Sequence, residues 1–184
     1  MPCRFSPAPG RRSGVSMPAS PPTAPPMPFR PVVLPPSARG TLWLHSMPGR
    51  VERWEAFVAE AERVRLGVIV CLTPRHELSA LAPAYDAAVR ANTLPARWLH
   101  LPMRDFGLAD NVQAFRAGIE SLGRELTGGE AVLLHCAAGI GRTGTAAACL
   151  LKCLGLPADD ALQRVRDAGS NPQSAAQSGL IHGF

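Results

Sequence analysis

The chain has 184 residues, 46% of them hydrophobic and 18% charged, which is enough apolar content for one folded domain. Its net charge of +5 comes from five arginines in residues 1–39, a stretch without acidic residues, whereas fourteen basic and fourteen acidic residues balance from residue 40 onward. The balanced part lacks the basic surplus of a nucleic-acid-binding domain, and no stretch reaches the ~18 apolar residues of a membrane span. Five cysteines at irregular spacing do not suit a disulfide framework, so we expect a cytoplasmic protein. We also expect the protein to be a monomer.

Proline dominates the first part of the chain. Residues 1–39 contain twelve of the nineteen prolines and few large apolar side chains. Such a segment cannot bury enough apolar surface to offset the entropy lost on ordering. The composition therefore predicts a disordered or polyproline-like tail over residues 1–39 and one folded domain over residues 40–184.

From residue 41 onward the apolar pattern alternates between strand and helix. The predicted strands are residues 41–46, 68–72, 96–101 and 131–135, and the predicted helices are 52–65, 83–91, 111–126, 157–165, 174–182 and one that ends near residue 154. Strands that alternate with helices are typical of an α/β domain with a largely parallel central sheet flanked by helices.

Three loops follow predicted strands, at residues 73–77, 103–109 and 136–142. Ligands of parallel sheets bind beyond the carboxyl ends of the strands. Because all three loops leave such ends, we expect them to converge on one cleft. Asp110, just after the second loop, is predicted to cap the helix that begins at Asn111.

The stretch from Val132 to Gly144 carries the strongest motif of the chain. An apolar strand runs into His135 and Cys136, five loop residues follow, and Arg142 precedes a Thr-Gly pair that opens a helix. A loop that enters a helix N-terminus turns several backbone N–H groups inward, and the helix dipole adds partial positive charge. Such a cradle binds a dianion and stabilises a thiolate. A cysteine beneath a phosphate cradle therefore predicts phosphoryl transfer through a phosphocysteine.

Both side chains and backbone groups are expected to contact the phosphate and the sulfur in such a site. Arg142 offers a planar fork for two phosphate oxygens. Thr143 can donate its hydroxyl to the sulfur when that sulfur is the leaving group, and it can also simply cap the helix. The remaining phosphate contacts are expected from the backbone of Ala137, Ala138, Gly139, Ile140 and Gly141. No metal or cofactor is expected, because the N–H groups and Arg142 neutralise the phosphate.

The order His135, Cys136, five residues, Arg142, Thr143 resembles the active-site loop of the cysteine-dependent protein tyrosine and dual-specificity phosphatases. This resemblance implies a dual-specificity-phosphatase-like fold. It also implies that His135 orients the loop and does not exchange protons. The alternatives are a structural cysteine beside a turn and a rhodanese-like enzyme, whose loop lacks these glycines and the Thr-Gly exit.

The reaction also needs a carboxylic acid that protonates the leaving oxygen. Residues 101–107 resemble the acid loop of dual-specificity phosphatases, where an aspartate follows an X-Pro step at the end of a strand, and this resemblance implies Asp105 as the acid. Asp110 is the alternative, although its position at a helix start already explains it as a cap. The proline that usually follows in this loop is absent, and Ala109 stands near its place.

Two further segments narrow the resemblance to the cyclin-dependent-kinase-associated type of phosphatase. They are residues 71–78 and the end of the chain from Gln177. The resemblance implies that Arg75 and Glu77 lie at the rim of the pocket and that Gln177 packs near it. Solvated charges and a surface amide are the alternative interpretation. A kinase partner does not follow, because a shared fold does not carry a substrate with it.

The interior of the loop indicates the substrate class. Phosphoinositide phosphatases of this superfamily carry lysines among the five loop residues, whereas the five residues here are uncharged. We therefore expect a phosphorylated protein as substrate and partner, with phosphotyrosine and phosphoserine/threonine both open. The competing hypothesis is a pseudophosphatase that binds phosphoproteins without turnover, and sulfur or arsenate chemistry at the same cysteine is a further alternative.

Cys71 and Cys136 stand at the ends of two apolar strands. If these strands are neighbours, their spacing of ~4.8 Å lies within the Cα range of a disulfide. An oxidised thiolate is captured by a nearby thiol, so a redox switch between the two cysteines is predicted. Cys71 as a small buried packing residue is the alternative.

Overall fold

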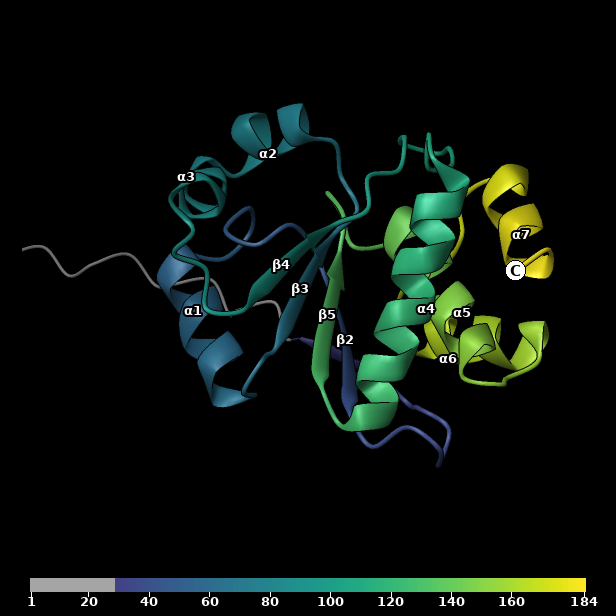
Figure 1. The fold of residues 1–184 in the computed structure, drawn as a ribbon. Helices are drawn as coiled ribbons and strands as arrows, with labels where there is room; N and C mark the ends of the chain where they lie inside the picture. Colours follow the sequence, from purple (N-terminus) through teal and green to yellow (C-terminus); the bar gives the residue numbers. More distant parts are fainter. Residues whose placement is uncertain (1–28) are drawn as a thin grey trace, which may run out of the picture.

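The computed structural model describes residues 29–184, so the predicted tail over residues 1–28 lies outside the described residues. The strands are β1 (Arg30–Val32), β2 (Thr41–His45), β3 (Val68–Cys71), β4 (Arg97–His100) and β5 (Ala131–His135). They form one sheet in the order β1-β2-β5-β3-β4, in which β1 is antiparallel to β2 and all other neighbours are parallel. Figure 1 shows β2, β5, β3 and β4 side by side. The predicted α/β fold with a largely parallel sheet is confirmed.

Helices cover both faces of this sheet. They are α1 (Trp54–Arg63), α2 (Arg75–Leu81), α3 (Pro83–Ala91), α4 (Val112–Gly128), α5 (Gly141–Cys153), α6 (Ala158–Asp167) and α7 (Ala175–His182). The helices α1 to α3 lie on one side of the sheet and α4 to α7 on the other (Figure 1). Apart from the corrections below, the predicted elements agree with the observed ones to within two residues at each end.

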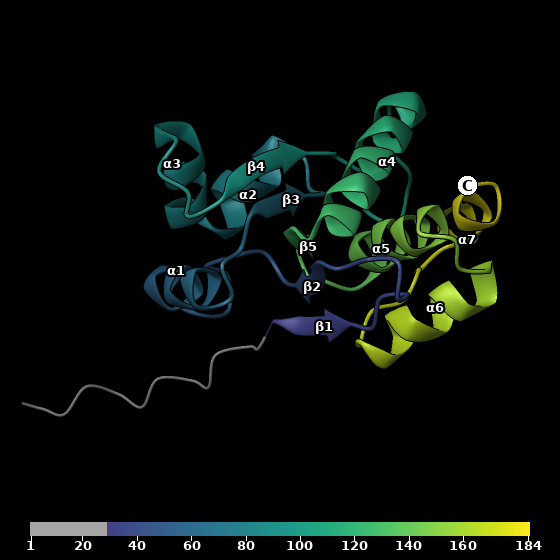
Figure 2. The same ribbon diagram turned by 60° about the horizontal axis from the view of Figure 1, so that its bottom comes forward.

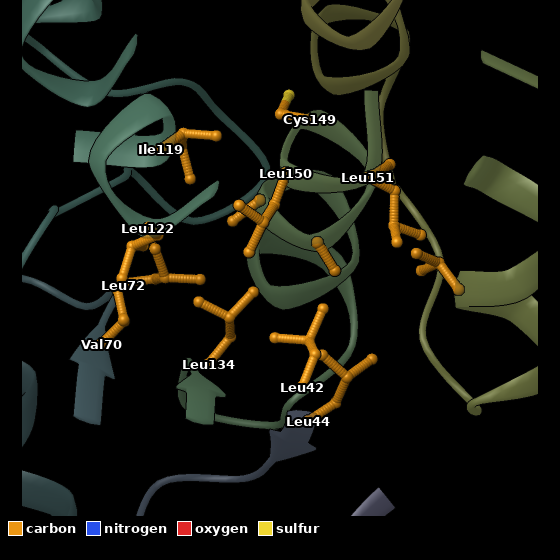
Figure 3. Close-up of a cluster of buried hydrophobic side chains, with 14 of the residues drawn as sticks. Leu42, Leu44, Val70, Leu72, Ile119, Leu122, Leu134, Cys149, Leu150 and Leu151 are labelled. Carbon is orange, nitrogen blue, oxygen red and sulfur yellow. The ribbon is translucent and has the colours of Figure 1, made fainter. Parts of the chain in front are cut away.

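Two apolar clusters line the two faces, because successive side chains of a strand point in opposite directions. The larger cluster joins the sheet to α4 and α5, and its members include Leu42, Leu44, Val70, Leu72, Ile119, Leu122, Leu134, Leu150 and Leu151 (Figure 3). Every residue of α5 from Gly141 to Leu151 is buried. The helix that follows the cysteine loop is therefore held on all sides, which gives the loop a rigid base.

Residues 29–39 pack on the folded domain, so the predicted tail over residues 1–39 is wrong for this segment. Phe29 is 5% exposed and lies against Trp43, with 6.2 Å between ring centroids. β1 pairs with β2, and Figure 2 shows it at the sheet edge close to α6. Pro31 is tolerated there because an edge strand needs fewer N–H donors. The prediction from composition rested on the many prolines and did not take account of two apolar residues that anchor the segment, Phe29 and Val32.

Two local predictions are also wrong. Residues 75–77 belong to α2 and not to a loop, because Pro74 both ends the preceding segment and suits the start of a helix. Asn111, not Asp110, caps α4, since its side-chain oxygen accepts a hydrogen bond from the Ala114 N–H at 2.9 Å. Asp110 instead forms an ion pair with Arg104 at 2.6 Å.

Candidate active site

The loop between β5 and α5 folds around the sulfur of Cys136. This residue is 2% exposed, and the backbone N–H of Gly139 donates to its Sγ at 3.2 Å. Gly139 has a φ of +73°, and a Cβ at this position would collide with the His45 backbone, so the turn requires glycine. The sulfur thus lies before the N-terminus of a buried helix, where N–H groups and the helix dipole favour an anion.

Arg142 lies in the first turn of α5 and is 3% exposed. Its Nη1 and Nη2 donate to the two carboxylate oxygens of Glu77 at 2.8 and 3.0 Å, and Nη1 also donates to the Met103 carbonyl at 3.4 Å. Nη2 is 3.5 Å from Oδ1 of Asp105. Burial by itself lowers the pKa of Arg142, but Glu77, Cys136 and Asp105 outweigh burial and raise it. The guanidinium therefore keeps its charge.

The segments that follow β3, β4 and β5 meet at Arg142, which confirms the predicted convergence. Asp105 is exposed over 64% of its side chain, so a molecule bound at the loop could reach its carboxylate. Gln177, almost fully buried, donates from Nε2 to the Gly107 carbonyl at 3.3 Å and so supports the loop that carries Asp105. The structure therefore brings Glu77, Asp105 and Gln177 to the site.

Thr143 is fully buried in the first turn of α5. Within residues 29–184 its hydroxyl oxygen has no hydrogen-bond partner, so the alternative role as a helix cap is wrong. A buried polar atom without a partner is unfavourable by about 1–3 kcal/mol, so each one in a folded protein needs an explanation, of which a catalytic role is one. The hydroxyl is free to donate to a group formed or bound at the loop.

His135 ends a row of hydrogen bonds behind the cysteine. The Trp98 indole N–H donates to the Tyr85 hydroxyl at 2.9 Å, and this hydroxyl lies 2.8 Å from Nε2 of His135. Nδ1 of His135 is 3.4 Å from the Cys136 carbonyl. Burial lowers the pKa of His135 to about 3, so the neutral ring accepts from Tyr85 and donates to the carbonyl. His135 thus holds the loop, while Tyr85 and Trp98 were not found from the sequence.

Neither a metal site nor a membrane span is visible in the part of the chain described. Among residues 29–184 no three His, Cys, Asp or Glu side chains gather closely enough to hold a metal ion. No helix in this part is both long and apolar enough to cross a membrane.

Comparison with known protein families decides which family this geometry represents. Residues 39–179 match the family described as PTP-SAK, the Swiss Army Knife protein DSP-PTPase phosphatase domain. The chain belongs to this phosphatase family.

Solved phosphatase structures share the fold. Kinase associated phosphatase, with its catalytic cysteine replaced by serine, matches with a TM-score of 0.72 at 22% identity over 87% of this chain and 96% of its own. Tk-PTP in its active form matches with a TM-score of 0.60 at 26% identity over 79% and 94%. PTPMT1 in complex with PI(5)P matches with a TM-score of 0.62 at 16% identity over 78% and 88%. The chain therefore shares the fold of the kinase-associated type, whereas a comparison with curated proteins found no match.

Two of the expected supporting residues contact groups outside the phosphatase loop, which comprises residues 136–142. The Arg75 guanidinium stacks over the Trp98 ring at 4.6 Å. Cys71 stands opposite His135 in the β3–β5 register, its sulfur is 3.3 Å from the Thr73 hydroxyl, and burial raises the pKa of its thiol to about 11. The two strands are neighbours, as the redox switch requires, and the switch itself stays a prediction.

Three further side chains hold carbonyl groups of the phosphatase loop and were not found from the sequence. Arg30 and Ser170 both donate to the Gly139 carbonyl. Arg50 donates to the Ala137 carbonyl at 2.7 Å, which also accepts from the backbone N–H of residue 47. The sequence contains no local signal for these contacts, because each joins segments at least thirty-one residues apart.

Proposed function

We propose that this domain hydrolyses phosphomonoesters on protein side chains, phosphotyrosine and/or phosphoserine/threonine, through a phosphocysteine intermediate. The observation that carries the proposal is the meeting of Cys136, Arg142 and Asp105 at one helix N-terminus, with the carboxylate 3.5 Å from the guanidinium. These residues supply a nucleophile, a cationic clamp and an acid, which are the groups that the reaction requires.

In the first step the Cys136 thiolate attacks phosphorus while the bond from phosphorus to the substrate oxygen breaks. Loop N–H groups and Arg142 stabilise the negative charge on the other phosphate oxygens, and Asp105 protonates the leaving oxygen. In the second step water attacks the phosphocysteine and gives a proton to the Asp105 carboxylate. The sulfur leaves as a thiolate, to which the Thr143 hydroxyl donates, and inorganic phosphate is released.

Glu77 sets which part of Arg142 is available to phosphate. The Glu77 carboxylate accepts from both terminal nitrogens, and the Met103 carbonyl accepts a second N–H of Nη1. The Nε–H and the second N–H of Nη2 remain as a fork for two phosphate oxygens. Because Nη2 is also the atom nearest Asp105, this fork would hold the phosphate beside its acid.

The rim supports a protein substrate. Ala137, Ala138 and Ile140 bring no cation that would meet a second phosphate. Phe106, next to Asp105, is 58% exposed, and Ile140 is 38% exposed, so apolar surface borders the site. Apolar side chains of a peptide that flank the phosphorylated residue can pack on this surface. We propose a phosphorylated protein as partner and a monomer as the acting form, without nucleic acid or membrane.

One observation favours the alternative, a domain that binds phosphoproteins without turnover. Glu77 already neutralises Arg142, and this ion pair must tolerate the added charge of a phosphate. A site of this kind can bind a phosphate weakly and still lack an efficient reaction. Turnover measurements therefore decide between the two functions.

The test uses the full chain with p-nitrophenyl phosphate and with phosphotyrosine and phosphoserine peptides. We expect turnover by the wild type and none by Cys136→Ser, which should remain folded and bind inorganic phosphate. Acid quenching of Asp105→Asn during turnover should trap phosphate on Cys136, detected by peptide mass spectrometry. Substantial turnover by Cys136→Ser would exclude the phosphocysteine mechanism. Peptide binding without turnover by the wild type would establish the binding module.

A further inference from the structure

The N-terminal segment contributes an arginine to the outer side of the phosphate-binding loop. Arg30, at the start of β1, is half-buried, and its Nη2 donates to the Gly139 carbonyl. Its Nη1 donates to the carbonyls of Ala168, at 3.1 Å, and Gly169 at the end of α6. Arg30 precedes residues 39–179, which match the phosphatase family, so this contact comes from outside the matched region.

The Gly139 carbonyl is held by two donors. Besides Arg30, the Ser170 hydroxyl donates to it at 2.7 Å. Since a peptide group is planar and trans, the N–H of Ile140 must point opposite to this carbonyl. Holding the carbonyl against Arg30 and Ser170 therefore turns the Ile140 N–H away from them. The neighbouring Gly139 N–H is the one that already donates to the Cys136 sulfur.

The charge of Arg30 acts on the same loop. Burial lowers the pKa of Arg30, whereas its interaction with Cys136 acts in the opposite direction. The guanidinium and the sulfur are thus electrostatically coupled across the loop. The same cation also offsets the negative end of the Gly139 carbonyl dipole, which would oppose an anion in the cradle.

We propose that Arg30 is a positioning residue of the phosphatase site, which holds the Gly139 carbonyl outward so that the Ile140 N–H is presented to the bound phosphate. The phosphoester as ligand rests on the proposed function, but the geometry requires only an oxyanion in the loop. The alternative is that Arg30 merely ties β1 to α6. Arg164 provides a matched control for that alternative, because it donates from α6 to the Val33 carbonyl at 2.9 Å.

The experiment compares full-length wild type with Arg30→Met, Arg30→Lys and Arg164→Met. Thermal unfolding reports the structural contribution of each arginine. Two measurements report the loop without needing turnover: an NMR titration with inorganic phosphate, and the rate of Cys136 alkylation by iodoacetamide at pH 6, followed by peptide mass spectrometry. Kinetics with p-nitrophenyl phosphate are recorded alongside.

Arg30→Met should weaken phosphate binding about tenfold, the low end for a charge-assisted hydrogen bond, and slow Cys136 alkylation severalfold. Arg30→Lys keeps the charge, but the lysine side chain cannot contact the loop and α6 at the same time. The phosphate affinity and alkylation rate of this variant should therefore lie between those of Arg30→Met and wild type. Arg30→Lys should also remain folded if Arg30→Met does not. Arg164→Met should change only the melting temperature. Wild-type phosphate affinity and alkylation rate in both Arg30 variants, or equal losses in Arg164→Met, would overturn the proposal. Absence of turnover in the wild type would instead count against the proposed function alone.

Discussion

The buried imidazole of His135 should make the stability of this domain depend on pH. Burial lowers the pKa of His135 to about 3, whereas an unfolded histidine titrates near ~6.5. Above ~6.5 the ring is neutral in both states. As the pH falls below ~6.5, the unfolded chain binds a proton that the folded chain refuses until about pH 3. Stability is therefore full at neutral pH and is lost progressively on acidification, by roughly 2 kcal/mol for this residue between pH 7 and pH 5.

Urea unfolding at pH 7 and pH 5, followed by tryptophan fluorescence, measures this loss. The informative variant is His135→Gln, whose amide can still bond with the Tyr85 hydroxyl but does not titrate. Protonation of carboxylates affects wild type and variant alike, so the comparison isolates the imidazole. The wild type should lose roughly 2 kcal/mol more than His135→Gln over this interval.

The control for this comparison is His76→Gln, at an exposed position on α2. It should behave as the wild type does. Parallel losses in wild type and His135→Gln would show that the folded protein accommodates a charged His135, and the argument from its burial would then be refuted.

Three further predictions concern the chemistry. Asp105→Asn should lower kcat by ~10²–10⁴ and remove the basic limb of the pH profile, while Asp110→Asn, at an exposed ion pair, should change kcat little; the reverse pattern would identify Asp110 as the acid. Arg142→Lys should lose most of kcat/KM, because a point charge cannot keep both Glu77 and a phosphate fork; near-normal kcat/KM would remove Arg142 from the clamp. After peroxide treatment, thiol should restore activity in the wild type but poorly in Cys71→Ala, and equal recovery would leave Cys71 as a packing residue.

The burial of Cys71 should slow the formation of the predicted disulfide with Cys136. Its thiol has a pKa raised to about 11 and contacts Thr73, so at neutral pH it is a protonated thiol. Capture of an oxidised Cys136 sulfur requires this thiol to lose its proton as the new bond forms. The exchange should therefore be slow at pH 7 and faster at higher pH, which a time course of disulfide formation at several pH values would reveal.

What the sequence determined by itself is the part of the site that is contiguous in the chain. The run from Val132 to Gly144 contains a buried strand, a glycine turn and a helix start, and each of these follows from neighbouring residues alone. Local order is therefore enough to predict a phosphate cradle with Cys136 as nucleophile, in a chain that belongs to a phosphatase family. The apolar runs likewise predicted the parallel strands, because a strand buried on both faces needs few polar positions.

Tertiary structure alone decided which distant groups act on that cradle. Glu77 bonds to Arg142 across sixty-five positions of the chain, and Arg30 reaches Gly139 across 109. Neither periodicity nor composition predicts such contacts, because they depend on how β1, α2 and α5 are placed at the carboxyl ends of the parallel strands. Tertiary structure also decided the boundary of the domain. The prolines of the first segment predicted a tail, whereas Phe29 packs against Trp43 and β1 pairs with β2. The free energy gained by burying Phe29 and pairing β1 outweighs the tendency of a proline-rich segment to remain unpacked. This gain exists only once the sheet has formed.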